Sequence, residues 1–180
     1  MVERVVSGVY AGLDLGSTKA CVVVVEVDAE DTRVIGVGSS PCAGLRRGVI
    51  VDVSRTVAAI RRATEEAQTA AGLPLTSVYA GLSGTHIDSF DSRGAIPISG
   101  RQHEVSVADR QGAVDAARTV AIPFDREVLH ILAQEFVVDD QAGIREPVGM
   151  LGVRLGAAVH LVTGAVSSVH NVSHTVNRAG

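Results

Sequence analysis

One stretch near the start of the chain decides its fold: Gly12-Leu13-Asp14-Leu15-Gly16-Ser17-Thr18-Lys19. It follows a short apolar approach and leads into an unbroken apolar run, 20–25. This order predicts a strand with an acid near its inner end, a turn of small hydroxylated residues and a returning strand. Such a hairpin can hold a phosphate, because consecutive turn amides point at an anion and neighbouring hydroxyl and ammonium groups add donors.

Each polar residue of this stretch has a candidate role. Gly16 lets the backbone approach a ligand closely, while Ser17, Thr18 and Lys19 supply further donors. Asp14 stands between apolar neighbours, where a bare buried carboxylate would be costly. A Mg²⁺ ion held through its water shell would offset that cost, so Asp14 is the candidate metal contact.

The same residues also fit an ordinary hairpin turn, with Asp14 bonding the backbone. Two better-known phosphate motifs are excluded. The spacing Gly-x4-Gly-Lys of the Walker A loop is absent, and a strand rather than a helix follows the glycine, unlike a dinucleotide-binding fingerprint.

The composition of the chain limits which classes of protein it can belong to. The chain has 180 residues, enough for one ordinary domain or two small ones, and its 46% apolar content is ample for a core. Aromatic residues make up only 3%, and the net charge of −4 without a basic block argues against a nucleic-acid surface. Two cysteines, Cys21 and Cys42, fit buried thiols in a reducing cytosol. With no signal-peptide pattern and no apolar segment of ~18 residues, we expect a soluble cytosolic protein.

The first half of the chain predicts three antiparallel strands, a helix and one more strand. The strands are expected at 9–16, 20–27 and 33–39, joined by short turns, of which the second is the acidic turn 28–31. After a loop, a helix begins at an N-cap near Asp52 or Ser54 and ends at Gly72. Two i,i+4 pairs, Arg61–Glu65 and Arg62–Glu66, are expected on its exposed face. A strand at 77–82 follows and ends in Ser83-Gly84.

The second half changes character. Two short strands are expected at 86–90 and 94–98, around Asp91-Ser92-Arg93. A helix capped by Ser106 with Asp109 follows, and its apolar side is expected to be Val107, Val114, Ala117 and Val120. Strands at 127–138 and 153–162 flank a loop at 139–149, and a last helix is expected at 165–179. The middle region therefore reads as a compact α+β insert within an α/β domain.

Other polar residues give weaker signals. Ser83-Gly84 could lie at a ligand cleft, since ligands collect at the carboxyl ends of strands, or form the hinge into the insert, which we favour. His86, His130 and His160 lack metal-ligand spacing and are expected to be packed or surface residues. Gln134 and Glu135 are expected to be structural or partner-contacting.

Three antiparallel strands, a helix and a strand form the opening order of ribonuclease H-like domains, in which actin-like ATPases place their first phosphate loop between strands one and two. The chain closely resembles one such family over its whole length, the FtsA family of bacterial cell-division proteins. The resemblance rests on five segments in the right order: 12–19 (GLDLGSTK), 44–52 (GLRRGVIVD), 77–87 (SVYAGLSGTHI), 128–136 (VLHILAQEF) and 147–155 (PVGMLGVRL).

The resemblance implies an α/β fold: an actin-like ribonuclease H-type domain, incomplete and lacking its last strand, with an inserted α+β subdomain. The domain would comprise 1–85 and 163–180, and the insert 86–162. The cofactors implied are ATP and Mg²⁺, bound by Asp14, Gly16, Ser17, Thr18 and Lys19, with Asp14 contacting Mg²⁺ through water. No catalytic residue is implied.

The resemblance also implies partners and a place in the cell. Complete FtsA-type proteins polymerise and anchor the FtsZ ring to the inner face of the membrane, at the division septum, through segments that this chain lacks. The insert 86–162 would contact the neighbouring filament subunit and late division proteins. Because one half of the nucleotide cleft is missing, we expect a fragment that binds ATP weakly and hydrolyses it poorly or not at all.

Two alternatives remain open at this stage. The chain could be a nucleotide-independent interaction module of the division machinery, or a pilus-assembly relative with a similar insert; a sugar kinase of the same superfamily lacks this insert. We also expect an exposed sheet edge and an uncovered apolar stripe on the last helix, which would favour self-association.

Overall fold

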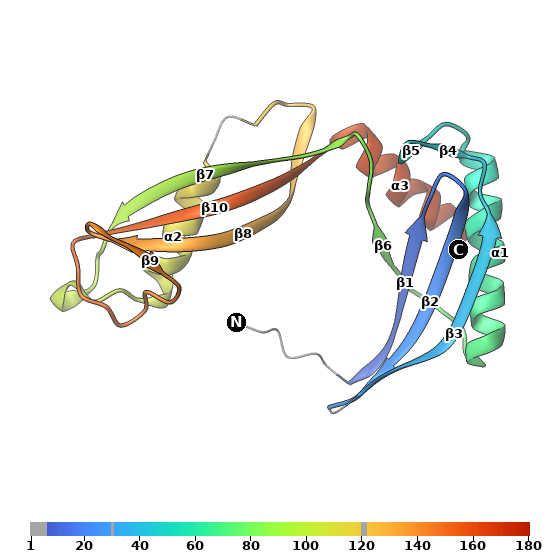
Figure 1. Ribbon diagram of the computed structural model, residues 1–180, viewed down its shortest axis with the longest axis horizontal. Coiled ribbons are helices and arrows are strands. Elements are labelled where there is room, and N and C mark those ends of the chain that lie inside the picture. The colour runs from blue at the N-terminus through green and yellow to red at the C-terminus, as the bar shows by residue number, and fades with distance from the viewer. Residues whose placement is uncertain (1–6, 30, 120–121) are drawn as a thin grey trace. The chain divides into compact units, whose positions relative to one another are not determined.

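The computed structural model describes residues 7–29, 31–119 and 122–180 and divides the chain into two compact units (Figure 1). The first unit comprises Met1–His86 with Ser167–Gly180, and the second comprises Ile87–Val166. The second unit begins one residue later than the expected insert, 86–162, and ends at Val166, beyond the expected end.

The first unit contains a four-stranded sheet in the order β3-β2-β1-β6. Its strands are β1 (Gly8–Leu15), β2 (Lys19–Val27), β3 (Thr32–Pro41) and β6 (Tyr79–Gly81). The first three are antiparallel neighbours, and β6 pairs parallel to β1. The expected antiparallel strands, and a further strand after a crossover helix, are therefore confirmed.

Two helices, α1 (Val53–Ala71) and α3 (Val166–Ala179), share one core with the sheet. Alternation along β1 and β2 sends every second side chain into this core. The buried residues include Leu13, Leu15, Val22 and Val24 of the sheet, Ile60, Ala63 and Ala67 of α1, and Val172 of α3.

The bounds of α1 follow from its end residues. The Asp52 side chain caps the helix by accepting from the Arg55 amide at 2.9 Å. Gly72 ends it in the left-handed region, with φ 71°. Of the two predicted caps, Asp52 and Ser54, the structure uses Asp52, and the predicted end at Gly72 is confirmed.

The i,i+4 pairs Arg61–Glu65 and Arg62–Glu66 expected on α1 are not formed among the described residues, and one member of each pair contacts another element instead. Arg61 donates to the backbone carbonyls of Arg178 and Ala179 at the end of α3. Glu66 accepts from the Ser39 amide of β3 at 2.8 Å. Arg61 and Glu66 thus connect α1 to α3 and β3 instead of to residues one turn away on the same helix.

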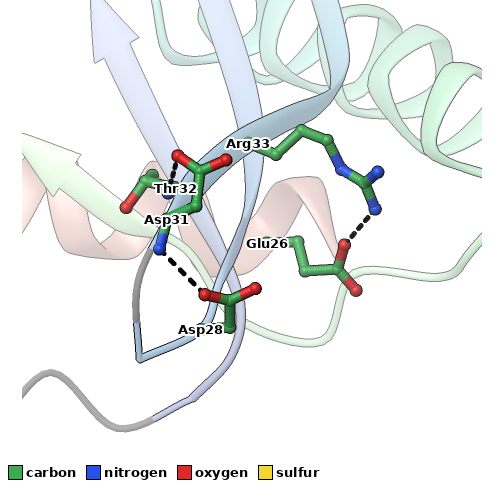
Figure 2. Close-up of polar contacts among 5 residues, drawn as sticks. All are labelled: Glu26, Asp28, Asp31, Thr32 and Arg33. Carbon is green, nitrogen blue, oxygen red and sulfur yellow. Dashed lines mark hydrogen bonds and ion pairs between the residues drawn. The ribbon is translucent and has the colours of Figure 1, made fainter.

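The acidic turn between β2 and β3 is held by short polar contacts (Figure 2). The Asp31 amide donates to Asp28 Oδ1, and the Thr32 amide donates to Asp31 Oδ1, each at 2.8 Å. Arg33 forms an ion pair with Glu26 across the two strands. Glu30, in the same turn, lies outside the described residues.

The loop expected between β3 and α1 contains a small hairpin that sequence analysis missed. Its strands are β4 (Leu45–Arg46) and β5 (Val49–Ile50), which pair antiparallel. Strands of two residues are too short to show a periodic pattern, so composition alone reads them as loop.

The second unit is a four-stranded antiparallel sheet in the order β7-β10-β8-β9, with α2 (Val107–Arg118) packed on β7 and β10. The strands are β7 (Ile87–Pro97), β8 (Arg126–Val138), β9 (Gln141–Ile144) and β10 (Arg154–Ala165), and the short helix η1 (Arg101–His103) precedes α2. Buried residues such as Phe136, Leu155 and Leu161 form a core separate from that of the first unit.

The prediction of two short strands around Asp91-Ser92-Arg93 was wrong, because β7 runs through these residues without a turn. Ser92 is buried and its hydroxyl donates to the Ala117 carbonyl at 2.7 Å, while Asp91 and Arg93 point outward. Polar residues that suggested a turn are thus accommodated within a strand. The expected loop at 139–149 likewise contains a strand, β9.

The predicted cap of α2 is confirmed. Ser106 and Asp109 form a capping box, with the Asp109 amide donating to Ser106 Oγ at 3.1 Å. The predicted apolar side was partly wrong, since Val107 is 69% exposed. Asp109, Ala113 and Ala117 are the buried residues of α2, and Val120 lies outside the described residues.

Candidate functional site

The candidate phosphate loop is the turn between β1 and β2. The Gly16 amide donates to the Lys19 carbonyl at 2.9 Å, which closes the turn, and the Thr18 carbonyl accepts from the Cys42 amide at 2.9 Å. Because the Gly16 amide serves the turn itself, the amides of Ser17 and Thr18 remain as the donors that the loop could offer to an anion. The side chains of Ser17, Thr18 and Lys19 are all exposed.

Asp14 is exposed, so the expectation that it is buried was wrong. It alternates with the core residues Leu13 and Leu15 and therefore lies on the outer face of the sheet. Its cross-strand neighbours are Cys21 on β2 and Gly81 on β6. The carboxylate needs no bound cation to offset burial, and the case for one rests on position alone.

The surroundings of Asp14 on the outer face are uncrowded. Gly12 and Gly81 carry no side chain, and a methyl group built on Gly12 would meet no atom within 4 Å. A single accessible carboxylate with free space beside it fits a hydrated Mg²⁺ ion, which binds through few protein ligands and keeps several waters.

Several chain segments converge at this end of the sheet. Since β6 is parallel to β1, its last residue Gly81 lies beside Asp14, and Ser83-Gly84 follow at once. Pro41, at the end of β3, pairs with Lys19. The carboxyl ends of parallel strands are where α/β sheets bind ligands, and the candidate residues lie at that edge.

A second turn at this end carries positive charge. The two central residues of the β4–β5 hairpin are Arg47 and Gly48, with φ of 51° and 80°. Positive φ at both positions is typical of a type I′ turn, in which an arginine costs about 1 kcal/mol of backbone strain. The side chains of Arg46 and Arg47 are exposed.

This hairpin turn packs against the backbone that follows β6. A methyl group built on Gly48 would lie 1.9 Å from the Ser83 carbonyl oxygen, and one built on Gly84 would lie 2.7 Å from the Arg47 carbonyl oxygen. Both glycines are therefore required by the close approach of two backbones. We call this contact between Arg47-Gly48 and Ser83-Gly84 the glycine interlock.

The remaining sequence candidates have local structural contacts. In the second unit, the Gly143 amide donates to Glu135 Oε2 at 3.1 Å, and His160 Nδ1 lies 2.7 Å from Asp91 Oδ1. Gln134 donates to the Leu132 carbonyl at 3.2 Å. Among the residues described, no three histidine, cysteine, aspartate or glutamate side chains gather in a way that could hold a metal ion.

No role for Arg46 and Arg47 was predicted from the sequence. The signal was present as two arginines and a glycine between apolar neighbours, Leu45 and Val49. These residues were interpreted only as part of a loop and as part of a segment, 44–52, that carries the resemblance to the FtsA family. The hairpin brings them to the same end of the sheet as Lys19.

Among the described residues, no strand pairs with the free side of β6, and a cavity lies there instead. A cavity of about 250 Å³ is lined by Ala80 and Leu82 near β6 and by Val169, Val172 and Val176 of α3. A separate cavity of about 370 Å³ lies on the other side of this segment, between Val9–Ala11 of β1 and Pro74–Tyr79. The expected sheet edge and the partly uncovered stripe of α3 are both present.

Comparisons with known proteins agree with the fold and the insert. Residues 84–163 match the model described as the SHS2 domain inserted in FtsA. By structure, the chain is similar to the PilM-PilN type IV pilus biogenesis complex, with a TM-score of 0.60 and 16% identity, covering 95% of this chain and 44% of that one. The chain therefore has the predicted fold class, an actin-like ribonuclease H-type α/β domain with an inserted α+β subdomain.

The sequence relatives give the particular family. The chain is 47% identical over 170 residues to the cell division protein FtsA of Pseudomonas aeruginosa, covering 94% of this chain and 40% of the relative. It is 38% identical to FtsA of Borreliella burgdorferi and 35% identical to FtsA of Escherichia coli, covering 94% and 100% of this chain and 41% and 43% of the relatives. The chain is thus related to the FtsA family of cell division proteins and spans about two fifths of their length.

No described helix is both long enough and apolar enough to cross a bilayer.

Proposed function

We propose that this chain supplies one wall of a nucleotide site in a cell division protein of the FtsA type. The turn Gly16–Lys19 would bind phosphate oxygens through the amides of Ser17 and Thr18, their hydroxyls and the Lys19 ammonium. Asp14 would hold hydrated Mg²⁺ from the adjacent strand. The observation that carries this proposal is the position of Asp14 and the turn at the carboxyl end of β1, beside the end of parallel β6.

The chemistry of the wall is binding and orientation. Lys19 and the two free turn amides would bind and align the phosphates. Asp14 would hold Mg²⁺, whose charge would further neutralise the phosphates when it is bound. A single wall leaves the phosphates in water, where such contacts are weak. We therefore propose that this chain binds ATP weakly and hydrolyses it slowly or not at all.

A titration of the 180-residue chain with MgATP, followed by backbone amide NMR shifts, tests this proposal. We expect saturable shifts at Ser17, Thr18 and Lys19, and at least a fivefold weaker binding in the Lys19→Ala variant. Arg33→Ala is the matched control, since it removes an exposed cation at the opposite end of the sheet. Binding that Lys19→Ala and Asp14→Asn both leave unchanged would refute the site.

We further propose the cellular role that the FtsA relatives suggest. In the complete protein, ATP binding would support filament formation and anchoring of the FtsZ ring at the septum, on the cytoplasmic face of the membrane, with a C-terminal membrane helix. The relatives at 35–47% identity favour this role over pilus assembly, since the pilus structure shares only 16% identity and supports the fold alone.

A second candidate function is a nucleotide-independent interaction module. The separate core of the second unit favours it, because that unit buries its own apolar residues without help from the first. Late division proteins would then dock on the insert. Capture of the cytosolic tails of division proteins by the chain, equal with and without MgATP, would support this function, and no capture in either condition would remove it.

A further inference from the structure

Helix α3 carries two of the six histidines of the chain, His170 and His174, four positions apart. Side chains at this spacing lie one above the other on the same face of an α-helix, with their Cβ atoms about 5–6 Å apart. The same spacing on a helix lets two imidazoles bind one zinc ion in the His-Glu-x-x-His motif. The backbone of α3 therefore places both rings within reach of a single ion.

Both histidines lie on the side of α3 that faces away from the core of the first unit. The buried residues of α3 are Val172 and Thr175, and Val176 packs against the same core. His170 and His174 are each two positions from Val172, so both point about 160° away from its direction around the helix axis. Both are exposed, and an ion with its bound waters can reach them from solvent.

Neither imidazole is engaged in another contact. Within the part of the chain that the structure describes, neither ring forms a hydrogen bond or an ion pair, and α3 contains no aspartate or glutamate that could pair with it. His160 differs, since its Nδ1 lies 2.7 Å from Asp91 Oδ1. His170 and His174 thus keep their ring nitrogens available, and neutral imidazole is the commonest metal ligand in proteins.

The donor atoms select the class of ion. Imidazole nitrogens suit zinc, copper and nickel, whereas Mg²⁺ and Ca²⁺ take oxygen ligands. Because each metal–nitrogen bond is about 2 Å long, the two ring nitrogens must approach to about 3 Å, and rotation of two neighbouring side chains allows this.

The number of protein ligands defines the kind of site. No third histidine, cysteine or carboxylate joins this pair among the described residues, so water would fill the remaining positions around the ion. A closed structural zinc centre uses four protein ligands. Two imidazoles on a solvent-exposed helix face instead suit an ion that exchanges with solution.

This pair is separate from the candidate nucleotide site. Helix α3 packs through Val172 on the face of the sheet that carries Leu13 and Leu15. Asp14 lies on the opposite, outer face. The two sites also differ in chemistry, since a carboxylate suits Mg²⁺ and a pair of imidazoles does not. Occupation of one site therefore does not depend on occupation of the other.

We propose that His170 and His174 bind one divalent transition-metal ion, Zn²⁺, Ni²⁺ or Cu²⁺, on the exposed face of α3. The bound ion joins two successive turns of the helix. An unfolded chain does not hold the two imidazoles at this spacing, so the ion binds the folded state more tightly and stabilises it. The stabilised helix is the one whose last carbonyls accept from Arg61 of α1.

Calorimetric titration of the 180-residue chain, without a polyhistidine tag, with NiCl₂ and with ZnCl₂ tests the site. A Cys21→Ser background removes the half-exposed thiol as a competing ligand. We expect one ion per chain, and a dissociation constant that rises at least about tenfold in His170→Ala and in His174→Ala, since even outer-shell partners of metal ligands contribute that much. His130→Ala, which removes an exposed histidine of the second unit, is the control and should change nothing. Excess MgCl₂ should not compete.

A rearranged variant separates the spacing of the histidines from their number. Asn171→His/His174→Ala keeps two histidines on α3 but sets them about 100° apart around the axis, so the loss of affinity should remain. NiCl₂ should also raise the melting temperature of the Cys21→Ser chain more than that of its His174→Ala variant, and melts without metal show that each variant is folded. Absence of binding, binding that neither alanine variant weakens, or full affinity in the rearranged variant would overturn the proposal.

Discussion

Arg61 of α1 donates from Nη2 to the backbone carbonyl of Arg178 in α3, at 3.0 Å. The same guanidinium also donates to the Ala179 carbonyl at 3.3 Å. The last carbonyls of a helix lack partners within the helix, and a cation placed there satisfies them and interacts favourably with the helix dipole. One side chain thus fastens the last helix of the first unit to α1, although 117 positions separate the two residues.

The contact of Arg61 predicts a selective loss of stability. Arg61→Ala should lower the free energy of unfolding by about 1 kcal/mol and speed hydrogen exchange in the last turns of α3. Arg62→Ala is the matched control, because Arg62 is the next residue on α1 and is also exposed. Urea unfolding and amide exchange measure both effects, and equal loss in the two variants would show that the carbonyl contact contributes nothing.

The packing of α1 on β3 predicts a large effect at Gly38. A methyl group there would lie 2.0 Å from the Ala63 carbonyl oxygen, so Gly38→Ala must push helix and strand apart. We expect a loss of about 2–3 kcal/mol. Gly12→Ala is the control, because the added methyl meets nothing within 4 Å; it should change stability by less than about 0.5 kcal/mol in the same urea titrations.

The glycine interlock predicts that Gly48 and Gly143 respond differently to the same change. Both have positive φ, 80° and 77°, so alanine strains both backbones alike. Only Gly48 has a neighbour in the way, the Ser83 carbonyl oxygen. Gly48→Ala should therefore destabilise the chain by at least about 1 kcal/mol more than Gly143→Ala. Thermal unfolding measures the difference, and similar losses would show that the interlock is loose.

Asp109 predicts an acid sensitivity of the insert. Hydrogen bonds from the Ser106 hydroxyl and amide, and from Ser99, lower the pKa of Asp109 from 3.8 to about 2. The folded state therefore binds the proton more weakly than the unfolded chain. The stabilisation is present above about pH 4 and is lost as the pH falls toward 2.

The comparison of Asp109→Asn with Asp140→Asn tests this assignment. Asp109→Asn should be less stable at pH 7 and should lose less stability between pH 4 and 2 than the unmodified chain. Asp140→Asn changes an exposed carboxylate and should keep the original pH dependence. Urea unfolding at each pH gives the slopes, and an unchanged slope in Asp109→Asn would count against the assigned pKa.

Much of the fold could be predicted from the sequence because its signals are local. Alternation along β1 and β2, the cap at Asp52, the left-handed stop at Gly72 and the capping box of Ser106 and Asp109 each act within a few residues. The prediction failed where a distant partner decides the structure. Ser92 is a strand residue because Ala117 accepts its hydroxyl, and that acceptor lies on α2.

In the candidate site, too, local features could be predicted and features that depend on distant residues could not. The turn Gly16–Lys19 was predicted from its residue types. The exposure of Asp14 could not be predicted in this way, because it depends on which face of β1 packs against the helices. The arginine turn at Arg47-Gly48 was missed because its place beside Ser83-Gly84 comes from backbone packing. Residue type indicates what a site could do, but only the topology shows which residues share it.

The first residue of β7, Ile87, pairs directly with Gly164 near the end of β10. The polypeptide therefore leaves for the insert and comes back along adjacent strands. Insertion of this subdomain does not require the first unit to change its backbone path, because the two connections to the insert lie side by side. The insert could therefore be replaced by a short linker. Another domain whose termini are equally close together could also be inserted at the same position.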